Sequence, residues 1–394
     1  MQLQLSEQHG AFRDTVRDFA RSVIAPRAAD MDRTGQHPHD IFHQMAGMGL
    51  LGVTIPREYE GLGADTLSYA IAVEEVSYAS GSVGLSLAAH NSLGAAPIYL
   101  YGTPEQKDRY LPNLASGRML GAFALTERHA GSDAGAIHTR AVRDGDGWLL
   151  DGAKVYCTSG GIAGVLSVAA LTDPAQGKRG ITSFLVEKGT PGLRVGKDED
   201  KFGCRASTTY QLFFEHVRLS DSQRLGPENQ GFKQFLTILD GGRISIGAMA
   251  VGLAQAAFDA ALAYSHMRQQ FGAPINRLQA IQFKLADMAC WVRASRLMVY
   301  KAAVLKDQGR PFAKQASMAK LYASELGERV CNEAIQIFGG NGYIRDYPVE
   351  RFYRDQRITE IGEGTSEIQK LVIGRELIRE YTALAEAREL VVAG

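Results

Sequence analysis

Residues 241–271 read GGRISIGAMAVGLAQAAFDAALAYSHMRQQF. This stretch is long and rich in alanine and larger apolar residues, so a helix formed by it must be buried on more than one face. Helical periodicity persists downstream, and the further long helices that it predicts span 278–308, 313–338 and 366–390. Helices of this length bury their apolar faces on one another, so we predict a four-helix bundle in the last part of the chain.

The composition upstream of the bundle is different between about residue 119 and about residue 226. Short β-type runs such as GITSFLVEKG and TTYQLFFEHVRL are separated there by turn residues such as RDGDGW. The run TTYQLFFEHVRL alternates in part between apolar and polar residues, as a half-buried strand does. Several strands without intervening helices predict a compact antiparallel β domain.

The first third of the chain is predicted to be helical. In TPEQKDRYL, Thr103 has the properties of an N-cap, Pro104 suits the first helical position, and Gln106 completes a capping box. The predicted fold class is therefore α+β. Its three predicted domains are an N-terminal helical domain (1–118), a central antiparallel β domain (119–226) and a C-terminal four-helix bundle (227–394).

The overall composition is that of a globular protein without an excess of either charge. The 394-residue chain is 45% hydrophobic, and its 43 Lys and Arg balance 43 Asp and Glu. A balanced chain without a basic run gives no support for nucleic-acid binding. No apolar run reaches the ~18 residues of a membrane helix, and MQLQLSEQHG has neither signal-peptide nor transit-peptide character. The four cysteines form no CxxC pair, so we expect reduced thiols and a cytoplasmic location.

Several catalytic motifs are absent from the sequence. It contains no GxSxG elbow, no GxxxxGK[ST] loop, no HExxH and no GxGxxG after a strand, which argues against serine hydrolases, P-loop enzymes, zincins and Rossmann dehydrogenases. The segment HPHDIFH clusters His37, His39 and His43, but Pro38 interrupts helical ligand spacing. We therefore expect no metal site.

Three glycine-containing stretches remain. ALTERHAGSDAG (124–135) and QIFGGNGYIRDYP (336–348) are either tight turns or backbone that a ligand such as pyrophosphate can approach. In EIGEGTSEIQKL, Ser366 and Gln369 have capping-box spacing, and Glu363 precedes the cap between two glycines. From the residues alone, Glu363 is either a partner of the helix dipole or a carboxylate with a chemical task.

The chain resembles the flavin-dependent acyl-CoA dehydrogenase family from about residue 5 to about residue 385. Each shared motif is weak alone, but seven occur in the order expected within a helix–β–helix pattern. They are AHNSLG (89–94), GTPEQKDRYLP (102–112), LTERHAGSD (125–133), GAKVYCTSGG (152–161), MRQQFGAPI (267–275), QIFGGNGY (336–343) and EGTSEIQ (363–369).

The resemblance implies an FAD between the β domain and the bundle. Ser132 matches a hydroxyl that helps to hold the flavin phosphates or the pantetheine of the substrate. Tyr156 lies where the family usually places a tryptophan against the flavin ring, and Thr158 matches the hydroxyl near N5. The strand edge under the isoalloxazine is matched by Phe123, Leu125 and Thr126.

The resemblance also implies that a neighbouring subunit holds the adenine and pyrophosphate end of the cofactor, within a homotetramer. An arginine there supplies charge and a fork of donors for phosphate. The matching positions are Arg268, Gln270, Phe271, Gln279, Gln336, Gly339 and Gly340, and Thr365 and Glu367 match further cofactor contacts.

By the same resemblance, Glu363 is the base that removes the α-proton of an acyl-CoA while hydride leaves for flavin N5. Asp240 and Arg243 match residues that line the thioester channel, and Gly364 matches a substrate contact. Some relatives carry the base at the position of Gly242, which here has no side chain. The product is a trans-2-enoyl-CoA, and the electrons pass to an electron-transfer flavoprotein.

Three departures from the family pattern bear on these expectations. Arg128 and His129 replace the usual Pro-Gly, Tyr156 replaces tryptophan, and Gly362 replaces a frequent tyrosine. Gly362 either admits short or medium chains with a branch near the α-carbon or only permits the turn geometry. An acyl-carrier-protein-linked dehydrogenase and an acyl-CoA oxidase remain alternatives, as does a non-catalytic family member that serves in an assembly.

Overall fold

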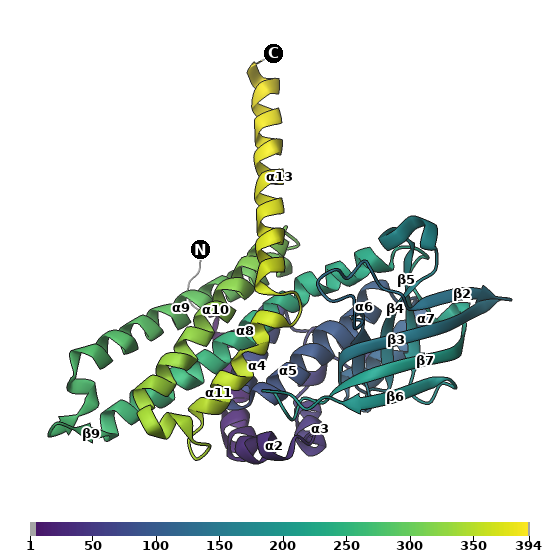
Figure 1. Ribbon diagram of the computed structural model, residues 1–394. Coiled ribbons are helices and arrows are strands. Elements are labelled where there is room, and N and C mark those ends of the chain that lie inside the picture. Colours follow the sequence, from purple (N-terminus) through teal and green to yellow (C-terminus); the bar gives the residue numbers. More distant parts are fainter. Residues whose placement is uncertain (1–4, 393–394) are drawn as a thin grey trace.

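The computed structural model of the protein describes residues 5–392, which form three regions in chain order (Figure 1). The N-terminal region is helical: α1 (Glu7–Phe19), α2 (Ala28–Thr34), α3 (His39–Gly47), α4 (Thr66–Ala79), α5 (Gly81–Ala89), α6 (Ala96–Tyr101) and α7 (Pro104–Ala115). The middle region holds β1 (Gly121–Ala124), β2 (Arg140–Asp144), β3 (Gly147–Thr158), β4 (Val165–Leu171), β5 (Ile181–Glu187), β6 (Leu193–Asp198), β7 (Thr209–Ser220) and β8 (Arg224–Leu225). The last region contains α8 (Gly231–Met267), the hairpin β9 (Gln269–Gln270) and β10 (Ala273–Pro274), α9 (Gln279–Asp307), α10 (Ala313–Phe338), α11 (Val349–Gln356), α12 (Ile358–Ile361) and α13 (Ser366–Val392).

This arrangement confirms the predicted α+β class of helical, β and helical regions. Helix α7 begins as its sequence predicts, because the Thr103 hydroxyl accepts from the Gln106 backbone N–H and the Gln106 side chain accepts from the Thr103 N–H. Two otherwise unpaired donors of the first turn are thereby satisfied by local side chains.

The sheet of the middle region is largely antiparallel, with two parallel pairings that the sequence did not indicate. The strand order is β6-β7-β3-β2-β4-β5-β8, and β1 pairs with β4. Strands β1 and β4 run parallel, as do β2 and β4 where they meet. The hairpin of β2 and β3 separates β1 from β4 along the chain, so the chain returns to β1 in the same direction.

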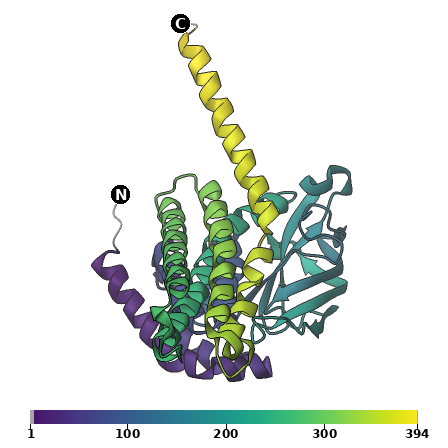
Figure 2. The same cartoon turned by 60° about the vertical axis from the view of Figure 1, so that its left-hand side comes forward.

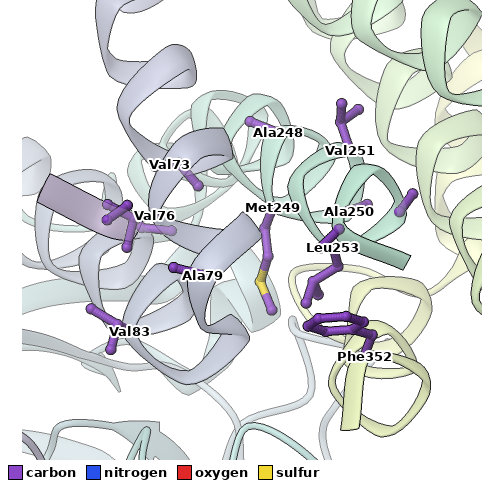
Figure 3. Close-up of a cluster of buried hydrophobic side chains, with 14 of the residues drawn as sticks. Val73, Val76, Ala79, Val83, Ala248, Met249, Ala250, Val251, Leu253 and Phe352 are labelled. Atoms are coloured by element: carbon purple, nitrogen blue, oxygen red, sulfur yellow. The ribbon is translucent and has the colours of Figure 1, made fainter. Parts of the chain in front are cut away.

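Helix α8 is the centre of the helical core and packs against α4, α9 and α10. Figure 3 shows Met249 and Leu253 of α8 between Val76 of α4 and Phe352 of α11. Close approach depends on glycine, because a Cβ on Gly252 would lie 2.2 Å from the carbonyl oxygen of Glu74. The helix pair α4 and α8 therefore touches through backbone atoms.

The sequence predicted no segment with the character of a membrane span, but α8 is long and apolar enough to have that character. Among residues 5–392 it is the single helix that passes this test, with an 18-residue window of mean hydropathy 1.5. Of that window, 67% is buried inside the protein. The apolar surface of α8 is thus occupied by its neighbours within the fold.

The fourth predicted helix of the bundle, α13, is arranged differently from the other three. It packs on α10 near its start and then projects away from the rest of the chain (Figures 1 and 2). Helix α4 of the N-terminal region packs on α8 and α9 instead. The exposed apolar side chains along α13 are Leu371, Leu377, Ile378, Tyr381 and Leu384.

Candidate active site

The loop between α12 and α13 meets α8 and α10 at Glu363. The backbone of Glu363 has φ +52°, and that of Gly364 has φ +95°. A left-handed conformation is unfavourable for a residue with a side chain and is often found where function requires it. Gly362 instead has φ −69° and ψ 153°, which any residue can adopt. The turn therefore does not require glycine at position 362, so turn geometry does not explain the presence of Gly362.

The cap of α13 differs by one residue from the predicted capping box. The Thr365 hydroxyl accepts from the backbone N–H of Ile368 at 3.4 Å, whereas the buried Ser366 hydroxyl has no hydrogen-bond partner among the described residues. The Gln369 amide turns back and donates to the Gly364 carbonyl at 2.8 Å. The left-handed backbone at Gly364 moves the cap from Ser366 to Thr365, and Glu367 remains exposed in the first turn.

The Glu363 carboxylate lies against the backbone of α8 at Gly242. Its Oε2 atom is buried and has no hydrogen-bond partner among the described residues. A Cβ on Gly242 would lie 1.8 Å from this oxygen, so a side chain at 242 and the present position of the carboxylate exclude each other. A buried acceptor without a partner is costly, and such groups are commonly found where chemistry uses them.

Two cationic side chains lie near this carboxylate. Arg243 of α8 is 4% exposed and donates to Ser317 of α10 at 3.2 Å and to Asp240. Lys320 of α10 is fully buried, and its Nζ donates to the Gly364 carbonyl at 2.7 Å. Burial raises the pKa of Glu363 to about 7, against the opposing effect of the Lys320 and Arg243 charges. A carboxyl group with this pKa exchanges protons near neutral pH.

The residues expected to contact the flavin ring are on β1, on β3 and in the loop that follows β1. Phe123 of β1 packs against Phe235 of α8, with ring centroids 4.5 Å apart. Tyr156 is 67% exposed and has φ +57°, so its aromatic ring is available to a ligand. Of the other predicted contacts, Thr126 and Thr158 are half-buried, Leu125 is buried and Ser132 is exposed. The accessible ring of Tyr156, with Thr158 two residues later on the same strand, suits an isoalloxazine.

The residues expected to hold the other end of the cofactor lie far from Glu363 within one chain. The hairpin of β9 and β10 is at the opposite end of the bundle from the β region (Figure 1). Phe271 at its tip is 91% exposed, and added Cβ atoms on Gly339 and Gly340 would meet nothing within 4 Å. This surface offers open backbone and a cation, as a pyrophosphate needs. The other members of this exposed set are Arg268, Gln270, Gln279 and Gln336.

The sequence analysis did not identify two buried lysines, Lys154 and Lys320, as candidate site residues. Lys154 of β3 is fully buried, and its Nζ donates to the Leu125 carbonyl at 2.9 Å and to Glu127 at 2.7 Å. Lys320 was detectable as a lysine at an apolar position, because it follows the buried Ala316 and Ala319 on α10. The alternation of β3 gave no comparable sign for Lys154.

The histidine segment gives no sign of a ligand set. The His37 ring is buried against Phe42, and both its nitrogens lack partners among the described residues. Burial lowers the pKa of His37 to about 4. The part of the chain that the structure describes contains no group of three or more metal-binding side chains.

The three-region fold, the buried Oε2 of Glu363 and the exposed ring of Tyr156 suit a flavin-dependent dehydrogenase. Family models for the acyl-CoA dehydrogenase N-terminal, middle and C-terminal domains match residues 6–118, 122–217 and 229–378. The chain belongs to the acyl-CoA dehydrogenase family. It is an oxidoreductase of this type, and the family is FAD-dependent.

Relatives agree over nearly their whole length. The probable acyl-CoA dehydrogenase YngJ of Bacillus subtilis is 52% identical over 96% of this chain and 100% of its own. Butyryl-CoA dehydrogenase of Megasphaera elsdenii is 42% identical with a TM-score of 0.94, covering 96% of this chain and all of that one. A chain in the structure described as the electron transferring flavoprotein of Acidaminococcus fermentans is 44% identical with a TM-score of 0.95, with the same coverage.

We predict that Gly242→Ala displaces the Glu363 carboxylate, because the new Cβ would lie 1.8 Å from Oε2. Acyl-CoA dehydrogenation should fall by about 10²-fold, as misplacement of a reacting group by about 1 Å does, while flavin content is retained. Gly241→Ala is the matched control, since its Cβ would meet only the flexible end of Lys306 at 3.1 Å. Equal rates for the two variants would contradict the packing of Glu363 on Gly242.

Proposed function

We propose that the protein catalyses the α,β-dehydrogenation of a short- to medium-chain acyl-CoA to the trans-2-enoyl-CoA, with Glu363 as the base. The observation that carries this proposal is the buried, unpartnered Oε2 of Glu363 over Gly242. The name of the butyryl-CoA dehydrogenase relative supports a short acyl chain. A group that only served the helix dipole would face solvent in the first turn, as Glu367 does.

Different residues of the chain have separate roles in removing a proton from the α-carbon. Glu363 accepts the proton, and a pKa of about 7 matches it to neutral pH. Arg243 is held by Asp240 and Ser317, so its charge stays next to the carboxylate. When bound, FAD supplies the acceptor for the hydride that leaves the β-carbon. Thr126, Thr158 and Tyr156 are the residues of this chain that would orient it.

The acyl group that we propose carries a branch or extra bulk near the α-carbon. Gly362 has an extended backbone, and an added Cβ would be in ordinary contact with Ile358, at 3.4 Å or more. Neither backbone strain nor a steric clash requires glycine at position 362. The missing side chain would therefore leave space for a branched or bulky acyl group. By the family resemblance, α5 would line the acyl pocket, and its residues Ser86 and Ala89 are also small.

We further propose that the enzyme works as a homotetramer and passes electrons to an electron-transfer flavoprotein in the cytoplasm. The exposed Phe271 hairpin and the projecting α13 are consistent with surfaces that other copies cover. The A. fermentans relative supports the choice of electron acceptor. Carrier-protein thioesters and direct oxidation by oxygen remain the alternatives that the assay must separate.

Glu363→Gln should retain fold and flavin but lose the base, with a rate reduction of at least ~10²–10⁴. The test is anaerobic titration of wild type and variant with acyl-CoA thioesters of several lengths, with flavin bleaching as the signal. We expect bleaching in the wild type and almost none in the variant. In the wild type, kcat/KM should fall as pH drops below about 7, since only the carboxylate accepts a proton. Near-normal turnover by the variant would require another base.

Arg268→Ala should weaken FAD retention and tetramer stability together, because the exposed guanidinium is proposed to reach a cofactor held by another copy. Loss of a phosphate-paired charge at an interface costs about 2–5 kcal/mol. Sedimentation velocity and flavin content at low protein concentration measure the two effects. Arg310→Ala, at the turn between α9 and α10, is the exposed control. A fully flavinylated, intact tetramer would contradict the cross-subunit role.

Gly362→Tyr should lower kcat/KM for branched thioesters about 10- to 200-fold relative to straight ones, by a clash of about 1–3 kcal/mol in the pocket. Gly362→Ala adds only the Cβ that the backbone tolerates, so it should leave the ratio nearly unchanged. The measurement is kcat/KM for matched straight and branched acyl-CoA pairs. An equal loss on both substrates would leave Gly362 without a role in branch selection.

A further inference from the structure

Lys320 is a buried cation without a carboxylate partner in hydrogen-bond contact. Its side chain is fully buried, and its recorded hydrogen bond is from Nζ to the Gly364 carbonyl, at 2.7 Å. The fully buried Lys154 behaves differently, because its Nζ lies 2.7 Å from the Glu127 carboxylate. Removing an ammonium from water is costly unless it is well compensated. Core packing alone therefore does not account for a lysine at this position next to Glu363.

The carbonyl that Lys320 binds belongs to the residue after the proposed base. It accepts a second hydrogen bond, from the Gln369 amide at 2.8 Å. Glu363 and Gly364 both have positive φ, so this turn is strained at Glu363 and must be held by its surroundings. Two buried donors that converge on one carbonyl provide that restraint.

The charge of Lys320 also acts on the Glu363 carboxylate. The charges that act on this carboxylate are those of Lys320 on α10 and Arg243 on α8, and Tyr69 of α4 is close enough to be affected by it. Three further carboxyl groups act on the two cations instead: Asp240 on Arg243, and Glu360 of α12 and Glu367 of α13 on Lys320. Arg243 is already hydrogen-bonded to Asp240. Lys320 has no such anion bonded to it among the described residues, so its charge is the less compensated of the two cations.

We propose that Lys320 is a positioning residue for Glu363, which fixes the Glu363–Gly364 turn through the Gly364 carbonyl and favours the ionised form of the neighbouring carboxylate. The proposal rests on the proposed role of Glu363 as the base. Both cations of the site depend on one face of α10. Ser317 accepts a hydrogen bond from Arg243, and Lys320 itself lies one turn further along the helix. The pKa of Lys320 is lowered to about 8 by burial, so the ammonium persists at neutral pH.

Lys320→Met removes the charge and the donors while keeping an unbranched side chain. Loss of a nearby positive charge raises the pKa of Glu363, so the acid limb of the rate of flavin reduction should move to higher pH by about one unit. The plateau rate should also fall about 10- to 100-fold as the turn loosens. The measurement is anaerobic single-turnover reduction by an acyl-CoA as a function of pH. An infrared titration of the Glu363 carboxyl in the apoprotein, identified by its loss in Glu363→Gln, measures the same shift without the cofactor.

Gln369→Leu is the control that separates position from charge. It removes the other donor to the Gly364 carbonyl, so the rate should fall while the acid limb stays at its wild-type pH. Lys314→Met removes a lysine of the same helix that pairs with Glu380 on α13, and should change neither quantity. Lys320→Arg restores a cation and should hold the limb at its wild-type position even where the rate is lower.

An acid limb and a carboxyl titration that stay at the wild-type pH in folded Lys320→Met would overturn the proposal. Where that variant does not fold, a limb displaced to higher pH in Lys320→Arg would overturn it instead. These outcomes differ from a failure of the proposed function, which is a Glu363→Gln variant that still turns over. With Glu363→Gln inactive and no shift from Lys320→Met, only the role of Lys320 is lost.

Discussion

A carboxylate oxygen that is buried without a hydrogen-bond partner carries a large desolvation cost. Oε2 of Glu363 is such an oxygen, and it lies where α8, α10 and the start of α13 meet. Each neighbour reduces this cost in a different way. Gly242 leaves room for Oε2, and Arg243 and Lys320 supply positive charge. The balance leaves the pKa near 7 instead of fully suppressing ionisation, which is the condition that a base at neutral pH requires.

Helix α8, which carries Gly242 and Arg243, is long, apolar and rich in small residues that allow close packing. Gly252 lets α4 touch its backbone, and Gly247 would place a Cβ 3.0 Å from Val299 of α9. Close helix contacts exclude water from the interior, and Gly242 continues this series at the site itself. The packing of the core and the burial of Oε2 of Glu363 therefore both depend on small residues of α8.

The sequence predicted what depends on local chemistry. Thr103 and Gln106 form their capping box because both partners lie in one turn, and α8 follows from a continuous apolar pattern. The sequence did not predict features that depend on contacts between distant parts of the chain or on an unusual backbone conformation. The cap of α13 moved to Thr365 because Gly364 is left-handed, and the contact of Lys320 with Gly364 joins residues 44 apart in the chain. Glu363 itself was identified through family resemblance, since a carboxylate near a helix start has an ordinary electrostatic explanation.

The two halves of the proposed cofactor site differ in how complete they are within one chain. Oε2 of Glu363 is buried and the pKa of Glu363 is raised within the single chain, whereas Tyr156 and Phe271 are exposed. Tyr156 is on β3, and Phe271 is in the hairpin at the opposite end of the bundle from the β region (Figure 1). Assembly of several copies would therefore add the contacts that hold the cofactor without creating the base. We therefore expect a dissociated protomer to lose affinity for FAD while keeping the Lys320 and Arg243 charges beside Glu363, because both cations are on α10 and α8 of the same chain as the carboxylate.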